Sequence, residues 1–142
     1  MQVVMFDRQS IFIHGMKISL QEHIPGIDVC AVNQADDLWR QLLQHPDALL
    51  ILDGGMDPGF CQWLLQEKFQ QFPESKCIII VNEYNQAWLS NMMAFNVQAI
   101  IPRDASVEVF VQTIKSVMRG LICLPGDWRM EYEQTRHGLD NL

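Results

Sequence analysis

A run of five apolar residues, Ala48-Leu49-Leu50-Ile51-Leu52, limits what this chain can fold into more than any other stretch. The run is too short for a free-standing helix, and it has the length of a strand that is buried on both faces. It ends in Asp53, which two glycines follow, and a second apolar run at 3–6 ends in the same way, in Asp7. In an open parallel α/β sheet, chemistry gathers just beyond the carboxyl ends of the strands. The two aspartates therefore mark the edge at which a site is expected.

Composition narrows the class of protein. With 142 residues, 49% of them apolar, the chain is expected to form one domain with a buried core. No apolar run approaches the ~18 residues of a membrane span, and the first residues lack the pattern of a signal peptide, so we expect a cytoplasmic protein that does not enter a membrane. The net charge of −7 argues against direct binding to nucleic acid, which needs clustered lysine and arginine. The cysteines form no Cys-x-x-Cys pair and are expected to be buried free thiols.

Strands and helices are expected to alternate along the chain. Asn33 is expected to cap the second helix, and Ser106 the last one. Asp57 followed by Pro58 predicts the start of the third helix, and Gly120 the end of the last. The periodicity of apolar residues predicts strands at 2–6, 27–32, 48–52, 76–81 and 97–101, and helices at 11–22, 34–44, 58–71, 85–95 and 107–119.

Strict alternation of five strands with five helices predicts a doubly wound α/β fold, because crossovers between parallel strands are nearly always right-handed. For a five-stranded sheet of this size we expect the flavodoxin-like order 2-1-3-4-5. In that order the first and third strands are neighbours, so Asp7 and Asp53 face each other across one crevice. The tail from Gly126 to Leu142 is polar and is predicted to be a linker or a frayed helix.

Residues near the predicted strand ends carry a resemblance to a known family. It extends over 2–122, and its marks in the first half of the chain are Asp7 after the first strand, Phe12 and Gly15 in the next helix, Asp53 after Leu-Ile-Leu, and Met56 three residues later. In these features the chain resembles the receiver domain of two-component response regulators, whose flavodoxin-like fold is also called CheY-like.

The second half of the chain narrows the resemblance. Arg103-Asp104-Ala105-Ser106 is similar to the Lys-Asp-Ala-Ser that closes the fifth strand in regulators with a LuxR-type helix-turn-helix, and 138–142 is similar to the linker before that domain. The resemblance implies a receiver domain at 1–124 and a linker at 125–142 toward a DNA-binding domain that lies outside this chain. DNA would then be bound only through that further domain.

The chemistry that the resemblance implies is phosphoryl transfer from a histidine kinase to an aspartate, which depends on positioning and charge neutralisation. Asp53 stands at the phosphoacceptor position, and Asp7 stands at the first of two acidic positions of the metal site. The resemblance implies that any Mg²⁺ would be held by these two carboxylates and the backbone carbonyl of Gly55. A lysine and a hydroxyl group contact the phosphate in the family and bias the domain between two states.

The second acidic position departs from the family pattern, because it holds Arg8. A unit charge ~4 Å from another is worth roughly 4 kcal/mol at an effective dielectric of about 20, so a divalent ion beside Arg8 could lose several kcal/mol as an upper bound. Alternatively, Arg8 pairs with Asp53 or Asp7 in the place of the metal. The simplest alternative is a solvated loop residue.

Three further positions depart from the pattern. Asn82 replaces the hydroxyl residue, and its amide could touch a phosphate or only make a turn. Arg103 replaces the lysine; its planar fork is not equivalent, and it is expected to pair with a carboxylate of the acidic site. Ile100 replaces the switch aromatic and is expected to be a core residue, so the usual coupling between phosphate and the far face is expected to be missing.

These residues favour a regulatory receiver of a transcription regulator that is not an enzyme. We expect an atypical receiver with weak or no Mg²⁺-dependent phosphorylation, acting through homodimerisation. The alternative is a functional receiver that a histidine kinase phosphorylates on Asp53, with at most weak autophosphorylation and autodephosphorylation of its own. A flavodoxin-like enzyme is disfavoured because the segment 7–10 contains no glycine. A small-molecule ligand such as a nucleotide second messenger is neither supported nor excluded.

Overall fold

The computed structural model describes residues 1–7, 10–82, 90–92 and 94–123. These residues form a sheet of parallel strands in the order β2-β1-β3-β4-β5, which confirms the predicted fold and strand order. The strands are β1 (Gln2–Phe6), β2 (Asp28–Val32), β3 (Leu49–Asp53), β4 (Cys77–Val81) and β5 (Ala99–Pro102). The helices are α1 (Ser10–His23), α2 (Ala35–Gln44), α3 (Pro58–Gln71) and α5 (Val107–Met118).

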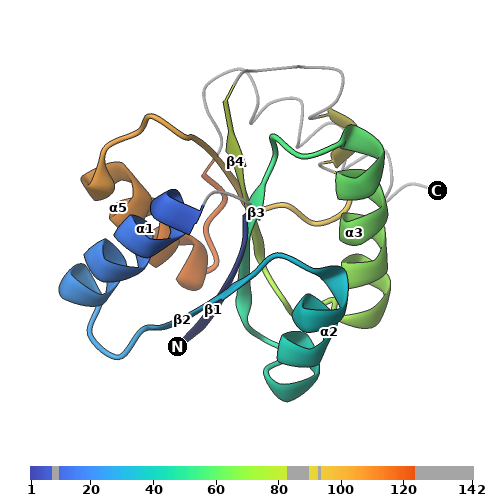
Figure 1. Ribbon diagram of the computed structural model, residues 1–142, viewed down its shortest axis with the longest axis horizontal. Coiled ribbons are helices and arrows are strands. Elements are labelled where there is room, and N and C mark those ends of the chain that lie inside the picture. Colours follow the sequence, from blue (N-terminus) through green and yellow to red (C-terminus); the bar gives the residue numbers. More distant parts are fainter. Residues whose placement is uncertain (8–9, 83–89, 93, 124–142) are drawn as a thin grey trace.

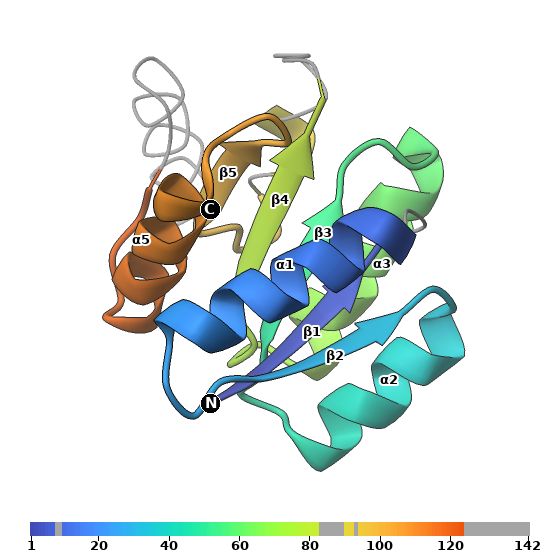
Figure 2. The same cartoon turned by 60° about the vertical axis from the view of Figure 1, so that its left-hand side comes forward.

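Helices cover both faces of the sheet. Figures 1 and 2 show α1 and α5 side by side on one face and α2 and α3 on the other. Alternate residues of β1 enter different cores: Val4 and Phe6 pack toward α2 and α3, whereas Val3 and Met5 pack toward α1 and α5. All five residues of β3 and of β4 are buried. Central strands covered on both faces account for the uninterrupted apolar runs in the sequence.

The predicted side-chain caps of α3 and α5 are confirmed. Asp57 accepts a hydrogen bond from the Phe60 amide at 2.9 Å, and Ser106 accepts one from the Val109 amide at 3.3 Å. The prediction that Asn33 caps α2 was wrong. The first helical bond runs from the Leu38 amide to the carbonyl oxygen of residue 34, so that residue is the N-cap, and its longer glutamine side chain makes no capping bond.

Three predictions fall wholly or mostly outside the described residues: the side chain of Arg8, most of the helix at 85–95, and the linker at 125–142. The backbone after α5 does follow the prediction, since Gly120 has a φ of 89°, which favours glycine. The four cysteines are free thiols; two are buried and two are half-buried. In the described part of the chain, no helix has the length and apolar character needed to cross a membrane.

Candidate functional site at the carboxyl edge of the sheet

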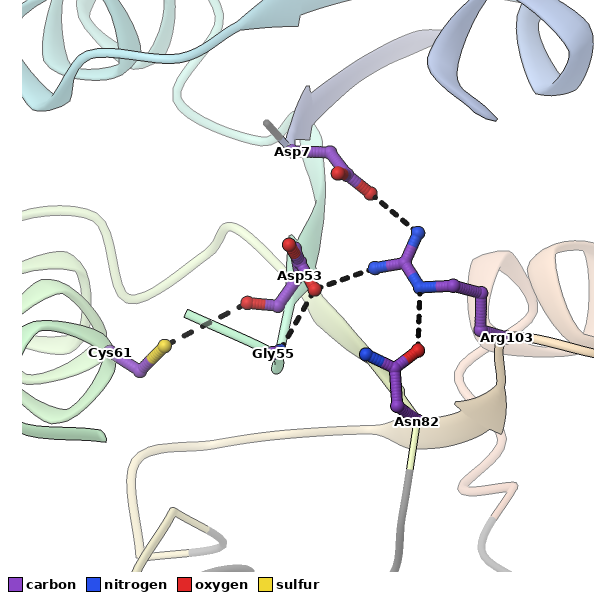
Figure 3. Close-up of polar contacts among 6 residues, drawn as sticks. All are labelled: Asp7, Asp53, Gly55, Cys61, Asn82 and Arg103. Carbon is purple, nitrogen blue, oxygen red and sulfur yellow. Dashed lines mark hydrogen bonds and ion pairs between the residues drawn. The ribbon is translucent and has the colours of Figure 1, made fainter. Parts of the chain in front are cut away.

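The register of the sheet brings four predicted site residues to one edge. Phe6 pairs with Leu52, so the next residues, Asp7 and Asp53, lie side by side at the ends of β1 and β3. On the other side, Val81 pairs with Pro102, so the residues that follow β4 and β5 are also neighbours. These are Asn82 and Arg103, and Figure 3 shows their side chains pointing toward the two aspartates.

Arg103 lies between the carboxylates and bonds to both. Its Nη1 donates to Asp7 Oδ2 at 3.1 Å, and its Nη2 donates to Asp53 Oδ1 at 2.6 Å (Figure 3). The third edge of the fork is also used, because Nε donates to Asn82 Oδ1 at 2.9 Å. The Arg103 side chain is only 14% exposed, and the Asp7 and Asp53 side chains are 2% and 8% exposed. Screening by water is therefore small, and these are charge-assisted bonds of the stronger kind.

An aromatic ring supports the same guanidinium. The central carbon of the Arg103 guanidinium lies 4.5 Å from the centre of the Phe12 ring, within the range of a cation–π contact. Phe12 in turn meets Phe110 edge to face, with ring centres 6.1 Å apart. Among the described residues, Arg103 thus has Asp7, Asp53 and Asn82 as polar partners and the Phe12 ring beside it, and the ring belongs to α1, which packs against α5.

Asp53 is fixed on its other side by its own loop. The Gly55 amide donates to Asp53 Oδ1 at 2.8 Å, and Cys61 Sγ lies 3.7 Å from the Asp53 carbonyl oxygen (Figure 3). A Cβ atom on Gly55 would lie 3.0 Å from Asn82 Nδ2 and 3.1 Å from Asp53 Oδ1. Glycine at this position is what lets the loop approach the carboxylate so closely.

The geometry resolves some of the alternatives in the sequence. Arg103 pairs with a carboxylate of the acidic site, as predicted, and it pairs with both of them. Asn82 makes a side-chain bond to Arg103 rather than acting only as a turn residue. Ile100 is a buried core residue, 4% exposed, as expected. Whether Arg8 also reaches the site stays a prediction, because it lies outside the described residues.

The arrangement of the two aspartates does not fit a Mg²⁺ ion. Both carboxylates are already neutralised in part by one guanidinium, and the Asp53 oxygen that accepts from Arg103 also accepts from Gly55. No group of three or more His, Cys, Asp or Glu side chains in the described ranges is arranged to hold a metal. Mg²⁺ prefers oxygen ligands at near-ideal octahedral positions, and a cation placed between these carboxylates would have to displace Arg103.

Sequence reasoning missed the contact between Phe12 and Arg103. Phe12 was noted only as a mark of the family resemblance, and a ring in the first turns of a helix is equally common in a core. The residues are 91 positions apart in the numbering, so no local pattern joins them. The sequence did contain a hint of this contact. Phe12 follows soon after the strand that ends in Asp7, and Arg103 follows a strand that ends at the same edge of the sheet.

Comparison with known proteins places this geometry in a family. No protein-family model matches the chain. Over all 142 residues the chain is 51% identical to YhjB of Escherichia coli (strain K12), which is named as an HTH-type transcriptional regulator. The chain spans 71% of YhjB. Over 123 residues it is 23% identical to the oxygen regulatory protein NreC of Staphylococcus carnosus (strain TM300) and spans 56% of that protein.

Solved structures give the fold. The isolated REC domain of RcsB from Salmonella enterica serovar Typhimurium matches with a TM-score of 0.78 at 22% identity, over 94% of this chain and 98% of that one. A LuxR family DNA-binding response regulator from Silicibacter pomeroyi matches with a TM-score of 0.74 at 19% identity, over 89% of this chain and 98% of that one. The sequence identity, which extends over 71% of YhjB, and the receiver fold both point to a regulator of transcription. The chain therefore belongs to the HTH-type transcriptional regulators that include YhjB, and it has the fold of a response-regulator receiver domain.

Proposed function

We propose that this receiver regulates transcription without depending on Mg²⁺ or on efficient phosphorylation of Asp53. One observation carries the proposal: the Arg103 guanidinium bonds to both Asp7 and Asp53 within a site that is nearly closed to solvent. A protein cation takes the place that an ion would need. The domain is thereby held in one arrangement of its acidic site.

The energetics support this reading. Hydrogen bonds to charged groups are worth about 1.5–3 kcal/mol each, and within the described ranges Arg103 donates to Asn82 and to two buried carboxylates. Admitting a divalent ion would break two of these and leave a displaced guanidinium near a like charge. Attack by Asp53 on a phosphoryl donor would bring more negative charge to a site whose cation is already shared between two acids. Both steps are therefore disfavoured relative to a receiver with a free acidic pair.

The output of the domain is proposed to follow the family. We place the receiver at 1–124 and a linker at 125–142, leading to a DNA-binding domain outside this chain, and we expect a cytoplasmic homodimer. Large apolar side chains are exposed on the paired helices α1 and α5, at Ile18 (44%) and Val109 (47%), which supports association of two copies. The domain acts as a regulator rather than as an enzyme, and it contacts DNA only through the further domain.

A direct experiment tests this proposal. The purified chain is incubated with acetyl phosphate and Mg²⁺, its intact mass is measured, and Mg²⁺ affinity is measured by calorimetry. We expect no stoichiometric gain of a phosphoryl group and no binding of Mg²⁺ at millimolar concentration. Arg103→Lys, which restores the residue usual at this position in the family, is expected to raise both, because a lysine cannot bridge the two acids as a fork does. Stoichiometric phosphorylation of the wild type that Asp53→Ala abolishes would overturn the proposal.

The second candidate is a working receiver that a histidine kinase phosphorylates on Asp53. One observation favours it: within the described part of the chain, Asp53 Oδ1 accepts from Gly55 and Arg103, whereas no hydrogen bond is made to Oδ2. That oxygen is available for attack, and Arg103 and Asn82 could then contact a phosphoryl group. The mass measurement above separates the two candidates, since only this one predicts a phosphorylated wild type.

A further inference from the structure

A cavity of about 610 Å³ lies at the outer edge of the sheet, beside the Asp7 end of the Arg103 bridge. Its floor is β2, the edge strand, and its walls are α1 and α2. The cavity exists because small side chains stand on the floor, where Cys30 is half-buried and Ala31 is exposed. Its volume is within the range of small-molecule sites, which run from roughly 300 to 1,000 Å³.

The charged side chains that line the cavity differ in whether they already have an ion-pair partner. Both acids already have arginine partners, since Asp7 bonds to Arg103 and Asp37 pairs with Arg40. Lys17 of α1 also lines the cavity, and in the described ranges it forms no ion pair. The amides of Asn33 and Gln41 add further donors. The cavity therefore offers a lysine without an ion-pair partner among the described residues and several hydrogen-bond donors. Each carboxylate in its lining already has an arginine partner.

A second cation can be recruited at little cost. Arg40 lies 3.4 Å from Asp37 in a pair whose side chains are 70% and 46% exposed. Only Nη1 of Arg40 is bound to Asp37 among the described residues, so its other donors can contact an anion in the cavity while Arg40 stays paired with Asp37. Lys17 lies on α1 and Arg40 on α2, on opposite faces of the sheet, so an anionic group over the β2 edge would have a cation on either side of that edge.

The rest of the lining is apolar. Ile13 contributes apolar surface on the α1 side of the β2 edge, and Cys30 and Val32 contribute it on the α2 side, so an apolar body can lie against either side of the edge. The strand edge adds a backbone donor and acceptor: Val32 faces β1, because its carbonyl accepts from the Asp7 amide, so the neighbouring Ala31 faces outward. β2 has no strand on this side among the described residues.

We propose that this cavity binds a small organic anion, a carboxylate or a phosphate joined to an apolar body, with Lys17 as its principal cationic contact. Asp7 lines the cavity and also bonds to Arg103. A bound anion therefore lies beside the acidic site and gives the domain an input that needs no phosphoryl transfer. The cavity and its ligand chemistry do not depend on whether Asp53 is phosphorylated.

Matched probes test the ligand class. We would use 1-naphthoate and 1-naphthyl phosphate, which share a body and differ in the anionic group, with 1-naphthol as the uncharged control. Binding is followed by the rate at which iodoacetamide alkylates Cys30, read by mass spectrometry in a Cys123→Ser background, because the other two cysteines are buried. At least one anion is expected to slow the alkylation of Cys30 at concentrations where 1-naphthol has no effect. Whichever of 1-naphthoate and 1-naphthyl phosphate binds more tightly identifies the anionic group that the cavity prefers.

Substitutions locate the site. Lys17→Glu is expected to weaken binding of the anions at least tenfold, Lys17→Arg to preserve it, and Ala31→Leu to abolish it by filling the cavity. Lys115→Glu is the matched control, since that lysine lies on α5 and outside the lining, and it is expected to bind normally. Equal binding of 1-naphthol, absence of Cys30 protection by either anion at millimolar concentration, or an unchanged affinity in Lys17→Glu would each overturn the proposal.

Discussion

At the scale of single residues, a guanidinium and a divalent ion neutralise carboxylates by different means. A metal gathers oxygen ligands around one point, whereas the donors of an arginine are spread over a rigid planar fork. Arg103 uses that spread: one edge reaches Asp7, one reaches Asp53, and Nε reaches Asn82. The central carbon of the guanidinium lies over the Phe12 ring, while the three edges of the fork make the hydrogen bonds. A lysine at position 103 could not satisfy all of these partners at once.

Removal of the Arg103 charge is expected to destabilise the domain. Arg103→Met leaves two buried carboxylates without their cation, and loss of one partner from a buried ion pair typically costs about 3–5 kcal/mol. The free energy of unfolding in urea measures the effect. Arg40→Met is the matched control, because the Arg40 pair is exposed, and it is expected to change stability by less than about 1 kcal/mol. If both variants lost equal stability, Arg103 would not be the structural centre of the site.

The sequence predicted that Arg103 pairs with an acid of the site, but it did not predict the other contacts of Arg103. Its place after the fifth strand was enough to bring it near Asp7 and Asp53, because parallel strands end at one edge. The sequence could not tell which arginine would lie between the acids, since Arg8 and Arg103 both follow strands at that edge. It also could not give the stacking on Phe12, which depends on how α1 is seated on the sheet.

At the scale of secondary-structure elements, α3 buries a charged side chain whose burial costs free energy. Lys68 is fully buried, and its Nζ finds no hydrogen-bond partner among the described residues. Burial lowers the pKa of Lys68 from its usual 10.5. Nearby Cys77 is also buried, and burial raises the pKa of its thiol to about 11. An apolar side chain of the same length would remove an unsatisfied polar group from the core.

We therefore expect Lys68→Met to stabilise the domain by about 1–3 kcal/mol at neutral pH. Because the folded pKa lies below the unfolded one, the unfolded wild type binds more protons between the two values, and wild-type stability rises with pH in that window. The advantage of the variant should shrink as the pH approaches 10.5. Urea unfolding at several pH values measures it.

Lys76→Met is the control for Lys68→Met. Lys76 Nζ donates to the Val117 carbonyl at 3.0 Å, so its loss should destabilise the domain rather than stabilise it. A Lys68→Met variant that is less stable than the wild type at neutral pH would show that the buried amine has a partner which compensates for its burial.

The elements themselves were largely predictable, and the exceptions have local causes. Apolar runs gave the central strands because those strands are covered on both faces. Asp57 and Ser106 gave helix starts because their short side chains reach the amide three residues on. Asn33 has the same chemistry but lies one residue too early, since the first helical bond is accepted at position 34. Cap chemistry locates a helix start to within a residue, and the backbone decides the rest.

At the scale of the whole molecule, Arg103 connects elements that lie far apart in the sequence. Through its partners it joins the ends of β1, β3, β4 and β5, and through Phe12 it reaches α1, whose ring contact with Phe110 extends to α5. If the proposed function holds, a domain with these ends tied together is expected to keep its shape when a phosphoryl donor is added. The strand order that makes this possible was predictable, but the tie between distant elements was not.

The oligomeric state should therefore be insensitive to the usual activating conditions. By sedimentation velocity, the wild-type chain is expected to show the same distribution of monomer and dimer in EDTA as in Mg²⁺ with acetyl phosphate. Arg103→Met frees the strand ends and the Phe12 ring, so it is expected to shift that distribution, whereas Arg40→Met, which alters only an exposed pair, is not. The contrary result would be a wild-type dimer that forms only with Mg²⁺ and acetyl phosphate and that Asp53→Ala prevents. It would mean that phosphorylation breaks the contacts of Arg103 and that these contacts do not hold the domain in one state.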